Sequence, residues 1–140
     1  MTATTPATFD PKPRQLGTVI DCIAAGAILG GQLVASNGSA DWTVTPGNKG
    51  TTGIPLGVAL YPQPTTGGHV AVAACGSVLM VCEGAGSAIT VGAQLQDSSA
   101  LGCVITAVAG VGLYFVGTAL TAISANSTGY ALINCGLKST

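Results

Sequence analysis

The feature that most constrains the fold of this chain is an internal similarity between segments 60 residues apart. Residues 56–60 (LGVAL) align with residues 116–120 (VGTAL), and residues 70–76 align with residues 130–136, both without a gap. A further block that begins at Gly26 matches at nearly the same offset when small gaps are allowed. Because three blocks recur in the same order, the sequence predicts an internal duplication of one unit of about 60 residues.

Both units carry the signals of short β-strands. Each has a Gly-x-Gln-Leu segment, a polar loop, a strand around Gly57 or Gly117, a turn rich in Thr, Ser and Gly, and an alternating strand that ends in Cys-Gly. A glycine inside a strand indicates a close backbone approach or a bulge. We therefore predict an all-β small barrel or sandwich of about eight to ten short strands, made of pseudo-repeats 16–80 and 81–140. The first polar loop, residues 36–55, is expected to be irregular.

No segment shows the 3.6-residue periodicity of an amphipathic helix, because glycine interrupts every long apolar run. Residues 101–123 carry no charge, and their length alone would suit a membrane-spanning helix. Yet four glycines cut this segment, and it is rich in Val, Ile, Thr and aromatic residues, which is typical of two buried strands around a glycine turn. We therefore expect strands and no membrane partner, with a spanning helix as the alternative.

The first fifteen residues differ from the rest of the chain. They are rich in Thr and contain three of the seven prolines, which favour extended backbone and exclude a central strand position. We predict an extended N-terminal arm, residues 1–15, that lies along a partner protein, with a disordered tail as the alternative. The arm residues expected to bind this partner are Phe9, Pro11, Lys12, Pro13 and Arg14.

Charge is scarce in this chain. Four basic and five acidic residues are too few to form a patch that grips a phosphate backbone, so we expect no nucleic-acid partner. Small uncharged residues must then cover much of the surface, which protects a protein poorly against association. The N-terminus lacks the apolar segment of a secretion signal. Composition thus predicts a protein that works inside an assembly.

Residues suited to catalysis are few and scattered. His69 is the only histidine, and because it follows a Gly-Gly pair we expect a surface residue near a turn. The carboxylates form neither a glycosidase-type pair nor a calcium loop; they are Asp10, Asp21, Asp41, Glu83 and Asp97. The five cysteines lack zinc-site spacing and are expected to be small buried hydrophobic residues in a reducing compartment. The sequence therefore predicts no enzyme, no cofactor, no metal site and no small-molecule substrate.

The Trp and Tyr side chains offer a second possible kind of site, because aromatic planes stack on sugar rings. These residues lie in separate segments of the chain, which favours core or interface positions instead. Tyr114 and Tyr130 fall in apolar strands. Trp42 and Tyr61 are the candidates for an interface.

Several segments of the chain together resemble the capsid decoration (head cement) proteins of tailed phages, the lambda-type family. The shared pattern is a Leu-Val strand, a polar loop, a Gly-Val-Ala strand, a Thr-rich turn and an alternating strand closed by glycine, found here in residues 33–34, 36–55, 55–60, 65–68 and 69–76. The resemblance covers about residues 28–84, and a weaker copy extends it to about residue 136.

This resemblance implies homotrimers on three-fold or quasi-three-fold capsid sites and an N-terminal arm that adds to the major capsid protein. It predicts a structural virion protein on the capsid exterior, assembled in the host cytoplasm, that stabilises the shell by bridging major capsid subunits. Lambda-type proteins have no evident second copy, so the lobe that faces the capsid stays open. The alternatives are another virion part, such as a tail or fibre-base subunit, and a β-sandwich receptor- or glycan-binding module.

Overall fold

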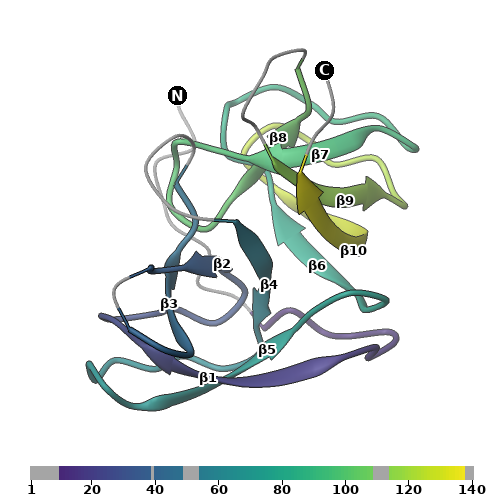
Figure 1. Cartoon of the computed structure of the whole chain (residues 1–140). Coiled ribbons are helices and arrows are strands. Elements are labelled where there is room, and N and C mark those ends of the chain that lie inside the picture. The colour runs from purple at the N-terminus through teal and green to yellow at the C-terminus, as the bar shows by residue number, and fades with distance from the viewer. Residues whose placement is uncertain (1–9, 39, 49–53, 109–113, 138–140) are drawn as a thin grey trace.

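The computed structural model describes residues 10–38, 40–48, 54–108 and 114–137 (Figure 1). These residues form ten β-strands in two sheets and contain no helix, which confirms the predicted all-β class and strand number. Accordingly, the described part of the chain holds no helix with the length and apolar character that a membrane crossing requires.

The first five strands form a closed barrel, called the barrel below. Its order is β1-β3-β2-β4-β5, and β5 pairs back to β1 (Figure 1). Most neighbours are antiparallel, but β1 and β3 run parallel. The barrel strands are β1 (Val19–Ala24), β2 (Leu33–Ser36), β3 (Thr43–Pro46), β4 (Pro55–Ala59) and β5 (His69–Ala73).

The last five strands form the second sheet, whose order is β6-β10-β9-β7-β8. All of its ladders are antiparallel. Its strands are β6 (Val78–Cys82), β7 (Gln94–Asp97), β8 (Val104–Thr106), β9 (Tyr114–Ala119) and β10 (Thr128–Leu137).

The strands of the two sheets follow the same circular order. Read from β6, the second sheet matches the barrel read as β1-β5-β4-β2-β3. The ladders even shift register at matching places, between Val34 and Ala35 in the barrel and between Leu95 and Gln96 in the second sheet. Each strand of the barrel thus corresponds to one strand of the second sheet, at close to the 60-residue offset seen in the sequence. The duplication itself is a statement about origin and stays a prediction.

Gly57 and Gly117 lie at equivalent places in β4 and β9. A Cβ atom on Gly57 would overlap the carbonyl oxygen of Ala73, and one on Gly117 would overlap that of Leu132. Only a residue without a side chain lets β4 approach β5, and β9 approach β10, this closely. The close approach inferred from these two glycines is therefore present.

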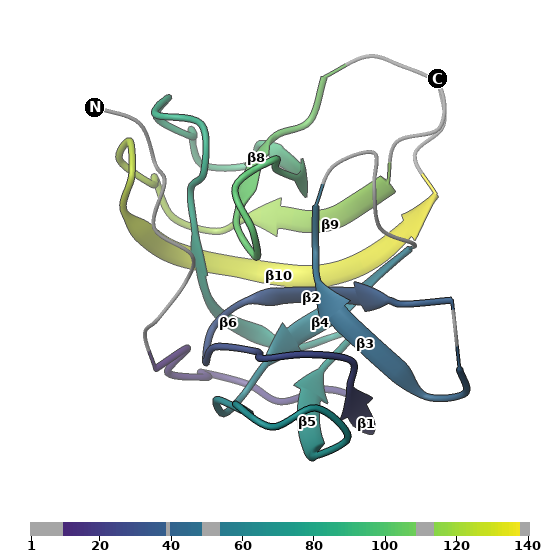
Figure 2. The same cartoon turned by 90° about the vertical axis from the view of Figure 1, so that its left-hand side faces the viewer.

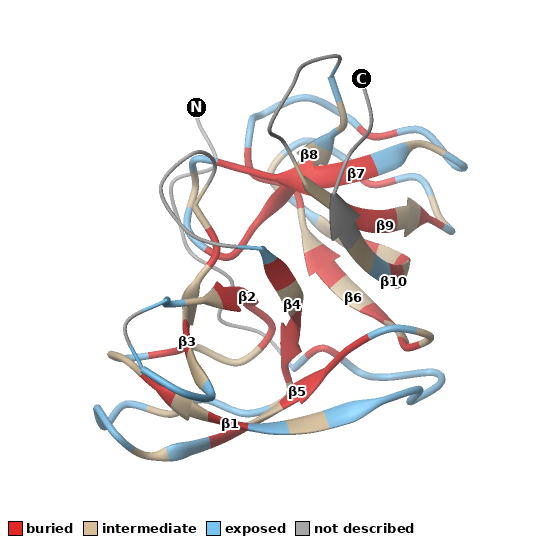
Figure 3. Cartoon of the chain, viewed as in Figure 1, coloured by how far each residue is buried: buried red, intermediate tan, exposed pale blue. Residues whose placement is uncertain are grey.

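A hydrophobic core joins the barrel to the second sheet. The larger cluster takes Leu33, Val58 and Ala73 from the barrel and its other members from the second sheet and from the connections between its strands. Strand β4 provides the contact, because it lies against both β9 and β10 (Figure 2). A second cluster fills the barrel interior, and the buried residues of both follow the strands in Figure 3. Each fully buried Val, Leu or Ile side chain contributes about 1.5–3 kcal/mol to such a core.

Two segments differ in how well the sequence predicted their strands. Residues 101–123 contain β8 and β9, as expected from their β-branched content, although residues 109–113 lie outside the described part. Residues 36–55, expected to be irregular, contain the strand β3. Its Thr-Val-Thr alternation buries Val44 and leaves both threonines half-buried, a pattern too short to stand out from the polar loop around it.

Candidate interaction surfaces

The outer face of the β1–β5 pair forms an open groove, called the barrel groove below. Burial alternates along β1, so Cys22 and Ala24 point into the barrel while Val19 and Asp21 point outward. The groove has a volume of about 610 Å³, and its lining residues are Val19, Ile20, Asp21, Ile23, Trp42 and His69. It is therefore a largely apolar surface that also carries the polar side chains of Asp21 and His69.

Trp42 stands at the edge of the barrel groove with 69% of its surface exposed. Its φ of 61° is rare for a bulky side chain. The surrounding hydrogen bonds fix this backbone, because Ile23 N–H donates to the Trp42 carbonyl at 2.8 Å and the Thr43 hydroxyl donates to the Ala40 carbonyl at 2.6 Å. A strained backbone held in this way points to a function for the side chain that it displays.

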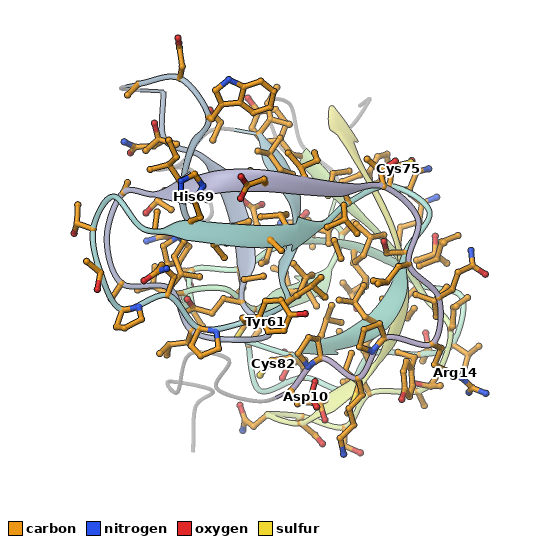
Figure 4. The ribbon with its side chains drawn as sticks, turned by 90° about the horizontal axis from the view of Figure 1, so that it is seen from below. Asp10, Arg14, Tyr61, His69, Cys75 and Cys82 are labelled. Carbon is orange, nitrogen blue, oxygen red and sulfur yellow. The ribbon has the colours of Figure 1, made fainter. Side chains whose placement is uncertain are left out.

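The side chains of His69 and Asp21 form a polar pair in the groove. His69 Nδ1 lies 3.1 Å from Asp21 Oδ2, and both side chains are more than two-thirds exposed. The antiparallel ladder sets this contact, because His69 pairs with Ile23, two residues beyond Asp21. Figure 4 shows His69 near one end of the β1–β5 pair. The predicted surface position of His69 is what the structure has, whereas its acidic partner, 48 residues away, was not predicted.

The described part of the predicted arm, residues 10–15, lies along the outer edge of β6. Met80 N–H donates to the Pro11 carbonyl and Arg14 N–H donates to the Val78 carbonyl, both at 2.8 Å. Val78 N–H returns a bond of 2.8 Å to the Gln15 carbonyl. A segment that adds main-chain hydrogen bonds to a sheet edge protects that edge from other strands.

The side chains of this segment are used in different ways. Pro11 is buried, while Lys12 and Pro13 are exposed. The guanidinium carbon of Arg14 lies 5.5 Å from the centre of the Tyr130 ring, within the range of a cation–π contact. Phe9, the predicted apolar anchor, lies outside the described residues. Arg14 thus stacks on its own chain, a contact that the sequence did not reveal.

The two predicted interface aromatics lie apart. Tyr61 is 64% exposed in the β4–β5 connection and does not line the barrel groove. Figure 4 places it away from His69, on the side of Cys82 and Asp10. Other large apolar residues are also exposed, namely Leu16, Ile54, Val91, Leu101, Val108 and Leu120. Of the exposed large apolar residues, only Val19 and Trp42 line the barrel groove.

Within the described part of the chain, no group of three or more His, Cys, Asp or Glu side chains is placed to hold a metal ion. The surfaces described above offer apolar contact, a polar side-chain pair and strand-edge hydrogen bonds. These are the means by which one protein binds another.

Comparison with known proteins adds the family. The structure resembles the crystal structure of the head fibre gp8.5 N base in bacteriophage phi29, with a TM-score of 0.62 and 17% sequence identity over 88% of this chain and 98% of the other. At this identity the likeness concerns the fold. No curated protein matches the sequence. The sequence model of the phage cement proteins matches residues 14–135. This match spans most of the chain, so the chain belongs to the phage cement protein family and is a structural component of a phage virion.

Proposed function

We propose that this protein binds the outer surface of the capsid and stabilises the shell by bridging major capsid subunits. Membership of the phage cement family is the observation that carries the proposal. A bridge of this kind is mechanical and needs no catalytic group. Each bridging contact adds area that must be lost before the lattice opens.

The barrel groove is the surface that we assign to the capsid. It combines the apolar side chains of Val19 and Ile23 with the exposed pair of Asp21 and His69. Protein interfaces commonly combine apolar area with a few polar groups, and tryptophan is enriched among their binding hot spots. We therefore assign the main capsid contact to Trp42.

The N-terminal residues provide a second attachment in this proposal. Residues 11–15 are bonded to β6, so residues 1–9 are the part that we assign to the major capsid protein, with Phe9 as anchor and Lys12 beside it. Self-association as a homotrimer would multiply these contacts, because linked binding sites hold more firmly than single ones. Assembly takes place in the host cytoplasm, on the exterior of the shell.

Binding to purified, expanded empty shells tests the assignment. Trp42→Ala is expected to weaken binding by roughly 30-fold, the loss typical of a truncated hot-spot residue. Its matched control is Val91→Ala, which removes an apolar side chain that is 64% exposed but lies outside the groove. Co-sedimentation with shells measures both variants. Equal binding of Trp42→Ala and wild type would remove the groove from the proposal.

The arm is tested with the same shells. A chain that lacks residues 1–9 keeps the hydrogen bonds of residues 11–15 and is expected to fold, but to occupy fewer capsid sites. Circular dichroism checks folding, and co-sedimentation measures occupancy. Full occupancy by the shortened chain would contradict the role of the arm.

A head-fibre base is the second candidate function, and the likeness to the phi29 head fibre N base favours it. The two functions differ in their effect on the shell. A cement protein that bridges subunits raises the temperature at which empty shells open, whereas a fibre base binds without this effect. Thermal opening of shells with and without saturating protein separates the two.

A further inference from the structure

Two cysteines flank the place where the second sheet stays open, called the seam below. Cys82 is the last residue of β6, and Cys103 directly precedes β8. The next residue of each strand, Glu83 and Val104, form an isolated parallel bridge, with a hydrogen bond of 2.9 Å from Gly84 N–H to the Val104 carbonyl. Cys82 and Cys103 directly precede this bridge on the two strands, and the side chain of Cys103 forms a hydrogen bond with Cys82.

At the equivalent location in the barrel, the corresponding strands form a complete ladder. There, β1 and β3 pair in parallel through Ile23 with Thr43 and through Ala24 with Val44. The second of these pairs corresponds to Glu83 and Val104 in the circular strand order. The first corresponds to Cys82 and Cys103, which do not form a ladder pair. Two thiols therefore occupy the place where the barrel has a pair that closes it.

The side chains of the two cysteines lie on one side of β6. A Cβ atom built on Gly84 would lie 2.6 Å from the Cβ of Cys103, so the Cys103 side chain occupies the space beside Gly84. Cys82 precedes Gly84 by two residues and thus points to the same side of the strand. A disulfide requires Cα atoms roughly 4.4–6.8 Å apart and Cβ atoms that face each other. The two cysteines flank one bridge, and the side chain of Cys103 forms a hydrogen bond with Cys82, so a small shift of β6 and β8 would bring the sulfurs into this geometry.

The thiol chemistry agrees with this geometry. A hydrogen bond from the Cys103 side chain lowers the pKa of Cys82, against the opposing effects of burial and the nearby Glu83 charge. Cys82 is also half-buried and so within reach of a small reagent, whereas Cys103 is buried. The thiolate is the attacking form of cysteine, which makes Cys82 the first sulfur to react.

We propose that Cys82 and Cys103 are a covalent modification site, at which an intramolecular disulfide closes the second sheet into a barrel. A small-molecule disulfide of the glutathione type is the oxidant. The Cys82 thiolate attacks one of its sulfurs and releases one reduced thiol; the Cys103 thiol then loses its proton to water and attacks the mixed disulfide at Cys82 sulfur, which releases the second. Two protein thiols are oxidised by two electrons, and one small disulfide is reduced to two thiols.

The timing of this reaction rests on the proposed function. Inside the host cytoplasm the pair stays reduced, and the second sheet assembles with its seam open. Release of the virion into an oxidising medium then closes the seam. The covalent link joins β6 to β8 independently of the hydrogen bonds that hold them in the reduced chain.

The test uses the purified full-length chain, reduced and then incubated with oxidised glutathione. We expect the intact mass to fall by two hydrogens and peptide mapping to locate one disulfide between residues 82 and 103. The midpoint of thermal unfolding should rise by on the order of 10 °C, because the link closes a loop of about 20 residues in the unfolded chain. Adding a reductant should reverse both changes.

Single substitutions provide the controls. Cys82→Ser and Cys103→Ser are each expected to abolish the mass change and the thermal shift, whereas Cys75→Ser, which removes an exposed thiol, should leave both intact. A disulfide mapped to another pair, or no loss of thiols in wild type, would overturn the proposal. Shell binding plays no part in these measurements, so they fail or succeed independently of the proposed function.

Discussion

The barrel and the second sheet share one strand order but differ at the strands that would close it. In the barrel, β1 bonds to both β3 and β5, so no strand edge is left free there. In the second sheet, β6 bonds to β10, and it meets β8 only through the Glu83–Val104 bridge. Closure of a barrel removes its edges, and an open sheet must protect them by other means. Here residues 11–15 cover β6.

The difference comes from a few residues at the seam. Ala24 is buried in the barrel interior, where its small side chain lets β1 and β3 approach. The corresponding residue of the second sheet is Glu83, fully buried, whose carboxylate accepts hydrogen bonds from the N–H groups of Ala85, Gly86 and Asn126. A buried carboxylate must be bonded in this way, because an unpaired one costs several kcal/mol. The comparison teaches that strand order and closure have separate causes.

The largest expected effect tests whether the two halves share a register. Gly57→Ala and Gly117→Ala each place a methyl group against a backbone carbonyl oxygen, so both should destabilise folding by at least about 3 kcal/mol. Urea unfolding measures the loss. Gly26→Ala is the control, because nothing lies within 4 Å of its Cβ position. A mild effect at one of the two strand glycines would break the correspondence between β4 and β9.

The next effect tests the residue that distinguishes the seam. Glu83→Ala leaves three backbone N–H groups without their acceptor, and we expect a loss of roughly 2–4 kcal/mol in the free energy of unfolding. Glu83→Gln keeps one acceptor oxygen and should lose less. The control Asp41→Ala removes an exposed carboxylate and should change stability by less than about 0.5 kcal/mol. An equal response of Glu83→Ala and Asp41→Ala would show that the carboxylate does not organise the seam.

The smallest effect concerns Cys75 and Cys135, which occupy matching positions at the end of the two units. Burial, followed by the Cys75 and Asp97 charges, raises the pKa of Cys135 from 9.0 to about 12. The folded chain therefore keeps this proton while the unfolded chain releases it, so its contribution is fully present below pH 9 and is lost as pH rises toward 12.

At pH 10 the loss relative to neutral pH should be about 1.4 kcal/mol for this thiol. Urea unfolding of wild type and Cys135→Ala at pH 7 and pH 10 measures it, because the variant lacks this part of the pH dependence. Cys75→Ala, at the exposed counterpart, should keep most of it, because burial is the largest cause of the raised pKa of Cys135. Parallel pH profiles for wild type and Cys135→Ala would contradict the assignment.

Some of the residues at the candidate sites could be predicted from the sequence, and others could not. Trp42 was predicted from the sequence as an interface residue, which stays a prediction, and the structure places it exposed at the edge of a groove. The His69–Asp21 pair and the stacking of Arg14 on Tyr130 join residues from distant segments. Strand register decides such contacts, and a single sequence carries no direct record of register. The arm was predicted to lie along a partner, and its described residues lie along β6 of the same chain.

The sequence by itself determined the all-β class, the spacing of the strands and the positions where only glycine fits, because these follow from local residue chemistry and periodicity. It also contained the residue pattern that resembles the capsid decoration proteins. Only the tertiary structure decided that one half closes and the other stays open, and that the side chain of Cys103 contacts Cys82. Closure depends on pairing between strands that lie 20 residues or more apart in the chain, and the free energy of that pairing is set by how both edges pack, not by either segment alone.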